Sequence, residues 1–240
     1  MKQINVKGAI VPSDEKWIYN MFDMDATCPK DISNVLSDLT DEPVELIINS
    51  GGGDVFSASE IYTELRSYKG EVNARIVGVA ASAATVISSA CSKVTMSPTA
   101  SYMIHKASTI GIGNSDDFQH ASDFLDTVDK SIVTAYMDKT GMAQEDLLQM
   151  MKDETWLSAS DAKEKGFVDE IMFSEQAKAV ASATGALPQN VIDTMRQQKQ
   201  QPQSITIEDI KSVVAEMKEE ILSEIKEETK SKPTNNSWLF

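Results

Sequence analysis

Across the first 174 residues, short apolar runs alternate with segments in which apolar residues recur every three or four positions. Runs rich in β-branched residues predict buried strands, and the three-to-four spacing predicts amphipathic helices. The expected strands are residues 3–11, 44–49, 72–79, 94–96, 101–105, 156–158 and 168–171. The expected helices are residues 30–38, 58–65, 83–91, 115–139, 143–152 and 161–165. The alternation predicts βαβ units around a largely buried sheet, and therefore an α/β fold.

Small residues predict where some of these elements begin and end. Three consecutive glycines at residues 51–53 predict a turn after the strand at 44–49. Ser160 is the expected N-cap of the helix at 161–165, and Gly166 is expected to end that helix.

The composition changes after Ser174. We expect a compact domain at residues 1–174 and a polar linker at 175–204, which is rich in Gln, Ala and Ser. Residues 205–240 predict an acidic amphipathic helix followed by a flexible C-terminus. The apolar residues of this helix keep a heptad-like spacing for only about two heptads. The helix can therefore either pack weakly on its own domain or bind a second copy or a partner.

Net charge limits the classes of partner. The formal net charge is −15 and the pI is about 4.5. Phosphate groups are bound by clustered Lys or Arg, and the sequence contains no such cluster, so we expect neither a nucleic-acid nor a membrane partner. No apolar run approaches the ~20 residues that span a bilayer, and the N-terminus lacks the apolar stretch of a signal peptide. We therefore expect a soluble, cytoplasmic protein.

Cysteine and histidine are scarce. Cys28 and Cys91 lie in unrelated contexts, which predicts two reduced thiols and no disulfide. His105 and His120 are the only histidines, so a multi-histidine metal site is not expected. Because His120 falls inside the helix expected at 115–139, we assign it a structural or surface role. No metal and no organic cofactor is implied.

Four features could carry chemistry. The glycines at 51–53 could present backbone N–H groups to an anion or oxyanion, or could simply form a turn. Ser82 lies among alanines where a strand passes to a helix, so it is either a helix cap or an exposed nucleophile. His105 ends a strand and is either a structural residue or a base. Asp153 and Glu154 are adjacent carboxylates that could be solvated or could orient that base.

Together these features provide each part of a nucleophilic mechanism. A hydroxyl becomes a good nucleophile when a base takes its proton, a carboxylate orients the base and N–H donors stabilise the oxyanion. The sequence offers one serine, one histidine, one pair of carboxylates and one glycine-rich segment for these roles.

The order of these segments resembles the proteolytic subunit of the Clp protease family, over about residues 5–172. The matching segments are Asn-Ser-Gly-Gly-Gly at 49–53, Gly-Val-Ala-Ala-Ser at 78–82, Met-Ile-His at 103–105, Trp-Leu-Ser-Ala at 156–159 and Gly-Phe-Val-Asp at 166–169. The resemblance implies the α/β spiral shared by Clp proteases and crotonases. It is closest to the phage and prophage branch of head maturation proteases, on the runs at 53–56, 111–114 and 154–157 and on the acidic tail.

The resemblance also implies roles for individual residues. Ser82 would be the nucleophile and His105 the general base, and the N–H groups of Gly52 and Ala83 would form the oxyanion hole. The family's aspartate falls here on Glu154, which we take as the acid, with Asp153 as second choice.

For the whole protein, the resemblance implies a serine endopeptidase that acts on protein or peptide substrates. It further implies a homo-oligomeric ring, a heptamer or stacked heptamers, with a capsid or scaffold protein or an ATP-driven unfoldase as partner. Two alternatives use the same sequence features differently. One is a crotonase-type acyl-CoA enzyme on the same fold, and the other is a catalytically inactive Clp-like assembly scaffold.

Overall fold

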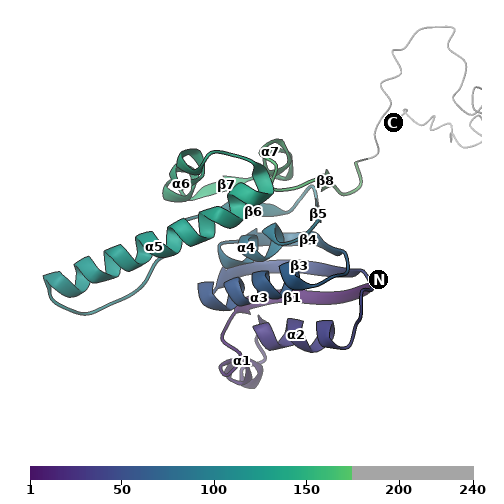
Figure 1. Cartoon of the computed structure of the whole chain (residues 1–240), viewed down its shortest axis with the longest axis horizontal. Coiled ribbons are helices and arrows are strands. Elements are labelled where there is room, and N and C mark those ends of the chain that lie inside the picture. Colours follow the sequence, from purple (N-terminus) through teal and green to yellow (C-terminus); the bar gives the residue numbers. More distant parts are fainter. Residues whose placement is uncertain (175–240) are drawn as a thin grey trace, which may run out of the picture. The chain divides into compact units, whose positions relative to one another are not determined.

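A computed structural model describes residues 1–174 of the 240-residue chain (Figure 1). The linker expected at 175–204 and the acidic helix and flexible C-terminus expected within 205–240 lie outside the described residues. The boundaries assigned to these segments therefore stay predictions.

Eight strands form one sheet within the described residues. They are β1 (Lys2–Ile10), β2 (Ala26–Thr27), β3 (Val44–Gly53), β4 (Val72–Ala81), β5 (Lys93–Met96), β6 (Ser101–Ile104), β7 (Thr155–Leu157) and β8 (Glu170–Ile171). The order is β2-β1-β3-β4-β5-β8, with β6 paired to β4 and β7 paired to β6. Every pair is parallel except β6–β7, as expected for strands joined by helical crossovers.

Seven helices accompany this sheet within the described residues. They are α1 (Lys16–Met21), α2 (Pro29–Ser37), α3 (Val55–Ser67), α4 (Ala83–Ser89), α5 (Ser115–Thr140), α6 (Gln144–Lys152) and α7 (Ala159–Glu164). Figure 1 shows α2, α3 and α4 side by side along β1, β3 and β4. The core between them is fully buried and built from Val, Ile and Leu of the central strands, including Val6, Leu46 and Ile76. None of the helices in residues 1–174 is both long and apolar enough to cross a membrane.

Strand β4 is shared between two neighbours, and this division positions the site. Residues 73–76 pair with β5, whereas residues 79–81 pair with β6. Between them, Gly78 lies against the side chain of Asn49, whose Oδ1 accepts a hydrogen bond from the Val79 N–H at 3.1 Å. A Cβ at residue 78 would lie 2.3 Å from that Oδ1, so a larger residue would displace the Asn49 side chain from its bond to Val79. Because the last residues of β4 pair with β6 rather than with β5, the carboxyl ends of β4 and β6 lie together.

The expected α/β architecture is confirmed, and most elements lie within a few residues of their predicted bounds. Two short elements were not predicted from the sequence, α1 and β2. Helix α1 has only six residues and none of them is buried, so its pattern is too short to identify a helix from the sequence.

The turn predicted at the three glycines is wrong, because β3 continues through them. Gly52 pairs with Ala9 and Gly53 pairs with Ile10 of β1. A Cβ at residue 53 would lie 2.1 Å from the Ile10 carbonyl oxygen. Gly53 therefore allows the backbones of β3 and β1 to approach closely, which is one of the roles that glycine has in strands.

The cap predicted for the last helix is also wrong. Ser158, not Ser160, caps α7, and its Oγ accepts a hydrogen bond from the Asp161 N–H at 3.2 Å. The Asp161 carboxylate in turn accepts a hydrogen bond from the Ser158 N–H at 3.2 Å, which completes a capping box. The Ser-x-x-Asp spacing at residues 158–161 is the sequence signal for this cap.

The scarce residue types have simple environments. Cys28 and Cys91 are both buried free thiols. His120 is exposed on α5, in agreement with the surface role expected for it.

Candidate active site

Ser82 occupies a strained turn between β4 and α4. Its backbone torsions are φ 54° and ψ −125°, a combination that non-glycine residues rarely adopt. The Ser82 N–H donates to the Met103 carbonyl at 2.9 Å, and the Ser82 carbonyl accepts from the Thr85 N–H at 2.9 Å. Serine nucleophiles of α/β hydrolases sit on this kind of strand-to-helix turn, where the hydroxyl is presented away from the backbone.

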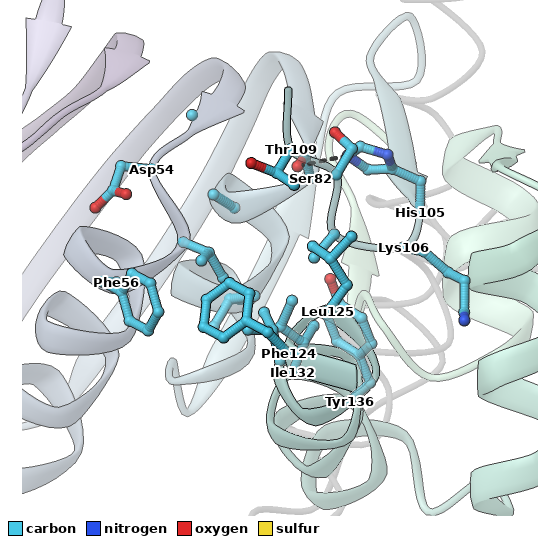
Figure 2. A pocket seen from close by; sticks show the side chains of 17 residues that line it. Asp54, Phe56, Ser82, His105, Lys106, Thr109, Phe124, Leu125, Ile132 and Tyr136 are labelled. Atoms are coloured by element: carbon cyan, nitrogen blue, oxygen red, sulfur yellow. Dashed lines mark hydrogen bonds between the residues drawn. The ribbon is translucent and has the colours of Figure 1, made fainter. Parts of the chain in front are cut away.

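His105 follows directly after β6 and reaches this serine. Its Nε2 lies 2.7 Å from Ser82 Oγ, which is within hydrogen-bond distance (Figure 2). Both side chains are half-buried. The division of β4 explains the contact, because Ala81 pairs with Met103 and the two chains then continue in the same direction. The structure thus brings together two residues that are 23 positions apart in the sequence.

The two carboxylates differ in where the sheet register places them. In the antiparallel β6–β7 pair, Ile104 lies opposite Thr155. Continuing this register by one residue places Glu154 opposite His105, whereas Asp153 lies one position further away. The side chain of Asp153 is engaged elsewhere, since both of its oxygens accept from Gln149 Nε2 at 2.9 Å.

Glu154 is exposed and has an unusual backbone with φ 48°. Its Oε1 accepts a hydrogen bond from Trp156 Nε1 at 3.4 Å. Among the hydrogen bonds of residues 1–174, neither Glu154 nor Asp153 bonds to the ring of His105. Glu154 therefore directly precedes β7, next to the last pair of the β6–β7 ladder, but the structure shows no bond from its carboxylate to His105.

Ala83 and two glycines lie beside the Ser82 turn. Ala83 is the first residue of α4, where backbone N–H groups have no partner within the helix. The Gly52 N–H donates to Ser50 Oγ at 3.1 Å. Gly53, rather than Gly52, lines the cavity beside Ser82. These contacts do not test the role predicted for Ala83. They show that the N–H predicted as a donor for Gly52 is already bonded to Ser50, and that Gly53, another of the three candidate glycines, lines the cavity.

A cavity of about 300 Å³ opens beside Ser82 and His105. Its far end is mostly apolar and is lined by Phe56, Val86, Phe124, Leu125, Val128, Ile132 and Tyr136 (Figure 2). The ring centroids of Phe56 and Phe124 are 6.2 Å apart, and both rings are largely exposed. The cavity can therefore accept an apolar side chain next to the serine hydroxyl.

The charged groups near the site are paired. Lys106 Nζ lies 3.1 Å from Asp129 Oδ2 and 3.4 Å from Asp126 Oδ1. The side-chain hydrogen bond to Asp129 is the largest cause that raises the pKa of Lys106. Asp54 accepts from the N–H and hydroxyl of Ser57 and so caps α3. Within residues 1–174, no three His, Cys, Asp or Glu side chains are grouped as a metal site.

This arrangement has the geometry of a serine hydrolase site, with a serine on a strained turn and a histidine nitrogen within hydrogen-bond reach. Residues 16–175 match the Clp protease family. The chain therefore belongs to the Clp protease family, which is a family of serine proteases. The resemblance to Clp proteolytic subunits is confirmed at the level of the family.

Curated relatives carry the same description. The chain is 32% identical over 138 residues to the ATP-dependent Clp protease proteolytic subunit 1 of Chlamydia abortus, covering 55% of this chain and 71% of the relative. It is 32% identical over 139 residues to the ATP-dependent Clp protease proteolytic subunit of Streptococcus salivarius, covering 56% of this chain and 71% of the relative.

A solved structure shows the same fold. A mutant of ClpP1 from Listeria monocytogenes superposes with a TM-score of 0.59 at 23% identity, covering 71% of this chain and 91% of that chain. The predicted Clp-like fold is therefore confirmed.

Proposed function

We propose that the protein is a serine endopeptidase that cleaves peptide bonds through an acyl-enzyme at Ser82. The observation that carries this proposal is the 2.7 Å contact between His105 Nε2 and Ser82 Oγ beside a cavity that several apolar side chains line. The family match favours this function over the acyl-CoA alternative, because that chemistry would not need a serine bonded to a histidine.

The reaction would proceed in two halves. His105 Nε2 takes the proton of Ser82 Oγ as the oxygen attacks the scissile carbonyl carbon, and then delivers that proton to the leaving amine. The C–N bond breaks and an ester to Ser82 remains. A water molecule, deprotonated by His105, attacks the ester and releases the new carboxyl end of the substrate. Ser82 Oγ regains its proton from His105.

Negative charge on the carbonyl oxygen requires backbone donors. We assign this role to the N–H of Ala83, where the N-terminal end of α4 also favours negative charge. We assign the second donor to Gly53 in place of Gly52. Two contacts support the change: the Gly52 N–H already donates to Ser50 Oγ, and Gly53 lines the cavity.

The acid that orients His105 is assigned to Glu154. The β6–β7 register supports this choice, because its continuation by one residue would bring Glu154 opposite His105, whereas Asp153 is bonded to Gln149. Glu154 would have to exchange its bond to Trp156 Nε1 for one to the histidine ring. Because the Glu154 side chain is exposed, that movement requires no repacking of the core.

The substrate class follows from the cavity. Its apolar lining, including Phe56 and Phe124, favours a large apolar side chain next to the scissile bond. Such a side chain would bury its surface on binding, whereas a charged side chain would lose its hydration without a free partner there.

The setting of this activity is also proposed. As in the Clp family, copies of this chain would assemble into a ring, a heptamer or stacked heptamers, in the cytoplasm. The resemblance to the phage branch supports a maturation protease that cleaves a capsid or scaffold protein during head assembly. This role predicts cleavage of such a protein without ATP. A strict requirement for an ATP-driven unfoldase would instead indicate a degradative subunit. The size of the ring is measured separately, by light scattering of the purified protein.

A fluorophosphonate probe tests the proposal, because it reacts only with an activated serine. We expect labelling of the assembled parent, no labelling of Ser82→Ala and full labelling of the control Ser131→Ala, which removes an exposed hydroxyl on α5. Absence of labelling in a folded, assembled parent would reject the peptidase and leave the inactive scaffold as the function.

A further inference from the structure

A chain of buried hydroxyls runs from Ser82 to α5. The Ser82 carbonyl accepts a second hydrogen bond from Thr85 Oγ1 at 2.5 Å. The same Thr85 oxygen lies 2.6 Å from the Tyr136 hydroxyl. Since Thr85 has a single hydroxyl proton and gives it to Ser82, the Tyr136 hydroxyl must donate to Thr85 Oγ1. Tyr136 thus supports the backbone of Ser82 through one intermediate.

These hydrogen-bonded hydroxyls are shielded from water. Thr85 is fully buried, and Tyr136 is 1% exposed. A buried hydroxyl without a partner is costly, so each of these groups depends on the next. Burial raises the pKa of Tyr136 far above its usual range, which keeps its hydroxyl protonated as a donor. The ring of Tyr136 lines the cavity, whereas its hydroxyl is bonded to Thr85.

A second residue of α5 holds the other half of the site. Asp129 Oδ1 accepts from the Ala107 N–H at 2.7 Å, and its Oδ2 pairs with Lys106 Nζ at 3.1 Å. These two partners directly follow His105. Asp129 is 2% exposed, although it carries a charge. A buried carboxylate is retained only where it is paired, so this contact ties the segment after His105 to the helix.

We propose that Asp129 and Tyr136 are positioning residues through which α5 sets the distance between Ser82 Oγ and His105 Nε2. The two residues are seven positions apart, or two helical turns, so they lie on one face of α5. Tyr136 holds the serine turn through Thr85, and Asp129 holds the backbone after the histidine. This inference rests on the proposed peptidase function.

The strained torsions of Ser82 explain why such support is needed. A residue in this region of backbone space costs about 1–3 kcal/mol and persists only where its surroundings hold it. The Thr85 hydroxyl is one of the groups that hold it. Without this bond the turn can relax, and misplacement by about 1 Å lowers a rate by on the order of 10²-fold.

The test uses substitutions that remove single polar groups. Tyr136→Phe removes only the hydroxyl and keeps the ring that lines the cavity. We expect kcat for a peptide substrate and the rate of fluorophosphonate labelling both to fall by on the order of 10-fold or more, with KM within about twofold, because positioning rather than binding is lost. Thr85→Val should behave like Tyr136→Phe, whereas Thr85→Ser keeps the hydroxyl and should retain most of the parent rate.

Two substitutions of Asp129 make the corresponding comparison. Asp129→Asn keeps an oxygen that can accept from the Ala107 N–H and should retain most of kcat, whereas Asp129→Ala should lose it. Thr134→Val serves as control, because it removes an exposed hydroxyl on the same helix. The urea midpoint of each variant is measured beside its rates, so that loss of folding is separated from loss of positioning.

The outcomes are distinct from those that test the proposed function. A labelled parent, together with Tyr136→Phe and Asp129→Ala variants that keep the parent kcat and labelling rate, overturns the inference and leaves the peptidase intact. Equal loss in Thr85→Ser and Thr85→Val also overturns it, because the hydroxyl would then not matter. If Tyr136→Phe does not fold, the Thr85 pair decides. An unlabelled parent rejects the peptidase and this inference with it.

Discussion

Replacing Gly52 with alanine should disturb the Ser82 turn directly. Strand β3 passes against this turn at Gly52, which is buried and has a backbone φ of +97°. A Cβ at residue 52 would lie 2.7 Å from both the Ala81 carbonyl oxygen and Ser82 Cβ, and 3.0 Å from the Ala83 nitrogen. These atoms belong to the turn itself, so the turn must shift to admit the new methyl group.

The magnitude follows from two costs. Placing a non-glycine residue at this φ costs about 1–3 kcal/mol, and forcing a methyl group into a packed region costs about 1–3 kcal/mol. We therefore expect Gly52→Ala to lower the free energy of unfolding by about 2–6 kcal/mol. Because the serine hydroxyl is carried by the displaced turn, we also expect the labelling rate to fall by on the order of 10²-fold.

The matched control is one residue away. Gly51 is exposed, its φ is not positive, and no atom lies within 4 Å of a Cβ built on it. Gly51→Ala should therefore leave the labelling rate unchanged and raise stability slightly, by about 0.4–1 kcal/mol, through lower entropy of the unfolded chain. Urea unfolding and fluorophosphonate labelling of both variants measure the contrast.

A Gly52→Ala protein that unfolds at the parent's urea midpoint and labels at the parent's rate would refute the reasoning. Equal effects of the two alanines would refute it as well. In either case, the close approach of β3 would not be what holds the Ser82 turn.

Three further predictions follow from the site and the core. Glu154→Gln should lower the peptidase rate by on the order of 10³–10⁴-fold and Asp153→Asn by little; the reverse ranking would reject the assignment of the acid. Phe124→Ala should lower kcat/KM for peptides with a large apolar residue before the scissile bond and spare those with alanine, and an equal loss for both would contradict the cavity's role. Burial raises the pKa of Cys91 from 9.0 to about 12 and that of Tyr102 from 10.0 to about 12. The unfolded chain therefore ionises first as pH rises, so stability is complete below about pH 9 and falls toward pH 12, by roughly 3 kcal/mol at about pH 10.5. Urea midpoints at the two ends of this pH range measure the loss of stability, which should be smaller in Cys91→Ala. A midpoint of the parent protein that does not change with pH would contradict this prediction.

Local patterns predicted most of the elements of the fold. The long helix α5 was expected at 115–139 and is Ser115–Thr140, because its apolar spacing extends over many turns and Asn114 caps it. Helix α1 and the glycine-rich part of β3 could not be predicted from local patterns. Helix α1 buries nothing, and the glycines at 51–53 favour a turn on local grounds although they form part of a strand.

The site residues also divide into those that local patterns indicated and those that they did not. Ser82 and His105 were singled out because they occur in a fixed order with the glycine-rich segment and the carboxylates, as in the Clp family, and the structure brings the two side chains within hydrogen-bond distance. The supporting residues were missed. Asp129 lies next to Val128 on the apolar stripe of α5, and a charge inside such a stripe was the signal available. Thr85 and Tyr136 look like ordinary core residues in the sequence.

The sequence by itself therefore determined the α/β class, the family, and the serine and histidine that approach each other, since these follow from local periodicity and from short segments in a fixed order. Tertiary structure alone decided which glycine N–H is engaged, that Asp153 is bonded to Gln149, and that α5 is bonded to both halves of the site. The bonds of α5 join residues that are far apart in the sequence, such as Thr85 and Tyr136, which are separated by 51 positions. Contacts over such separations depend on how the helices pack in three dimensions, and no local pattern encodes them.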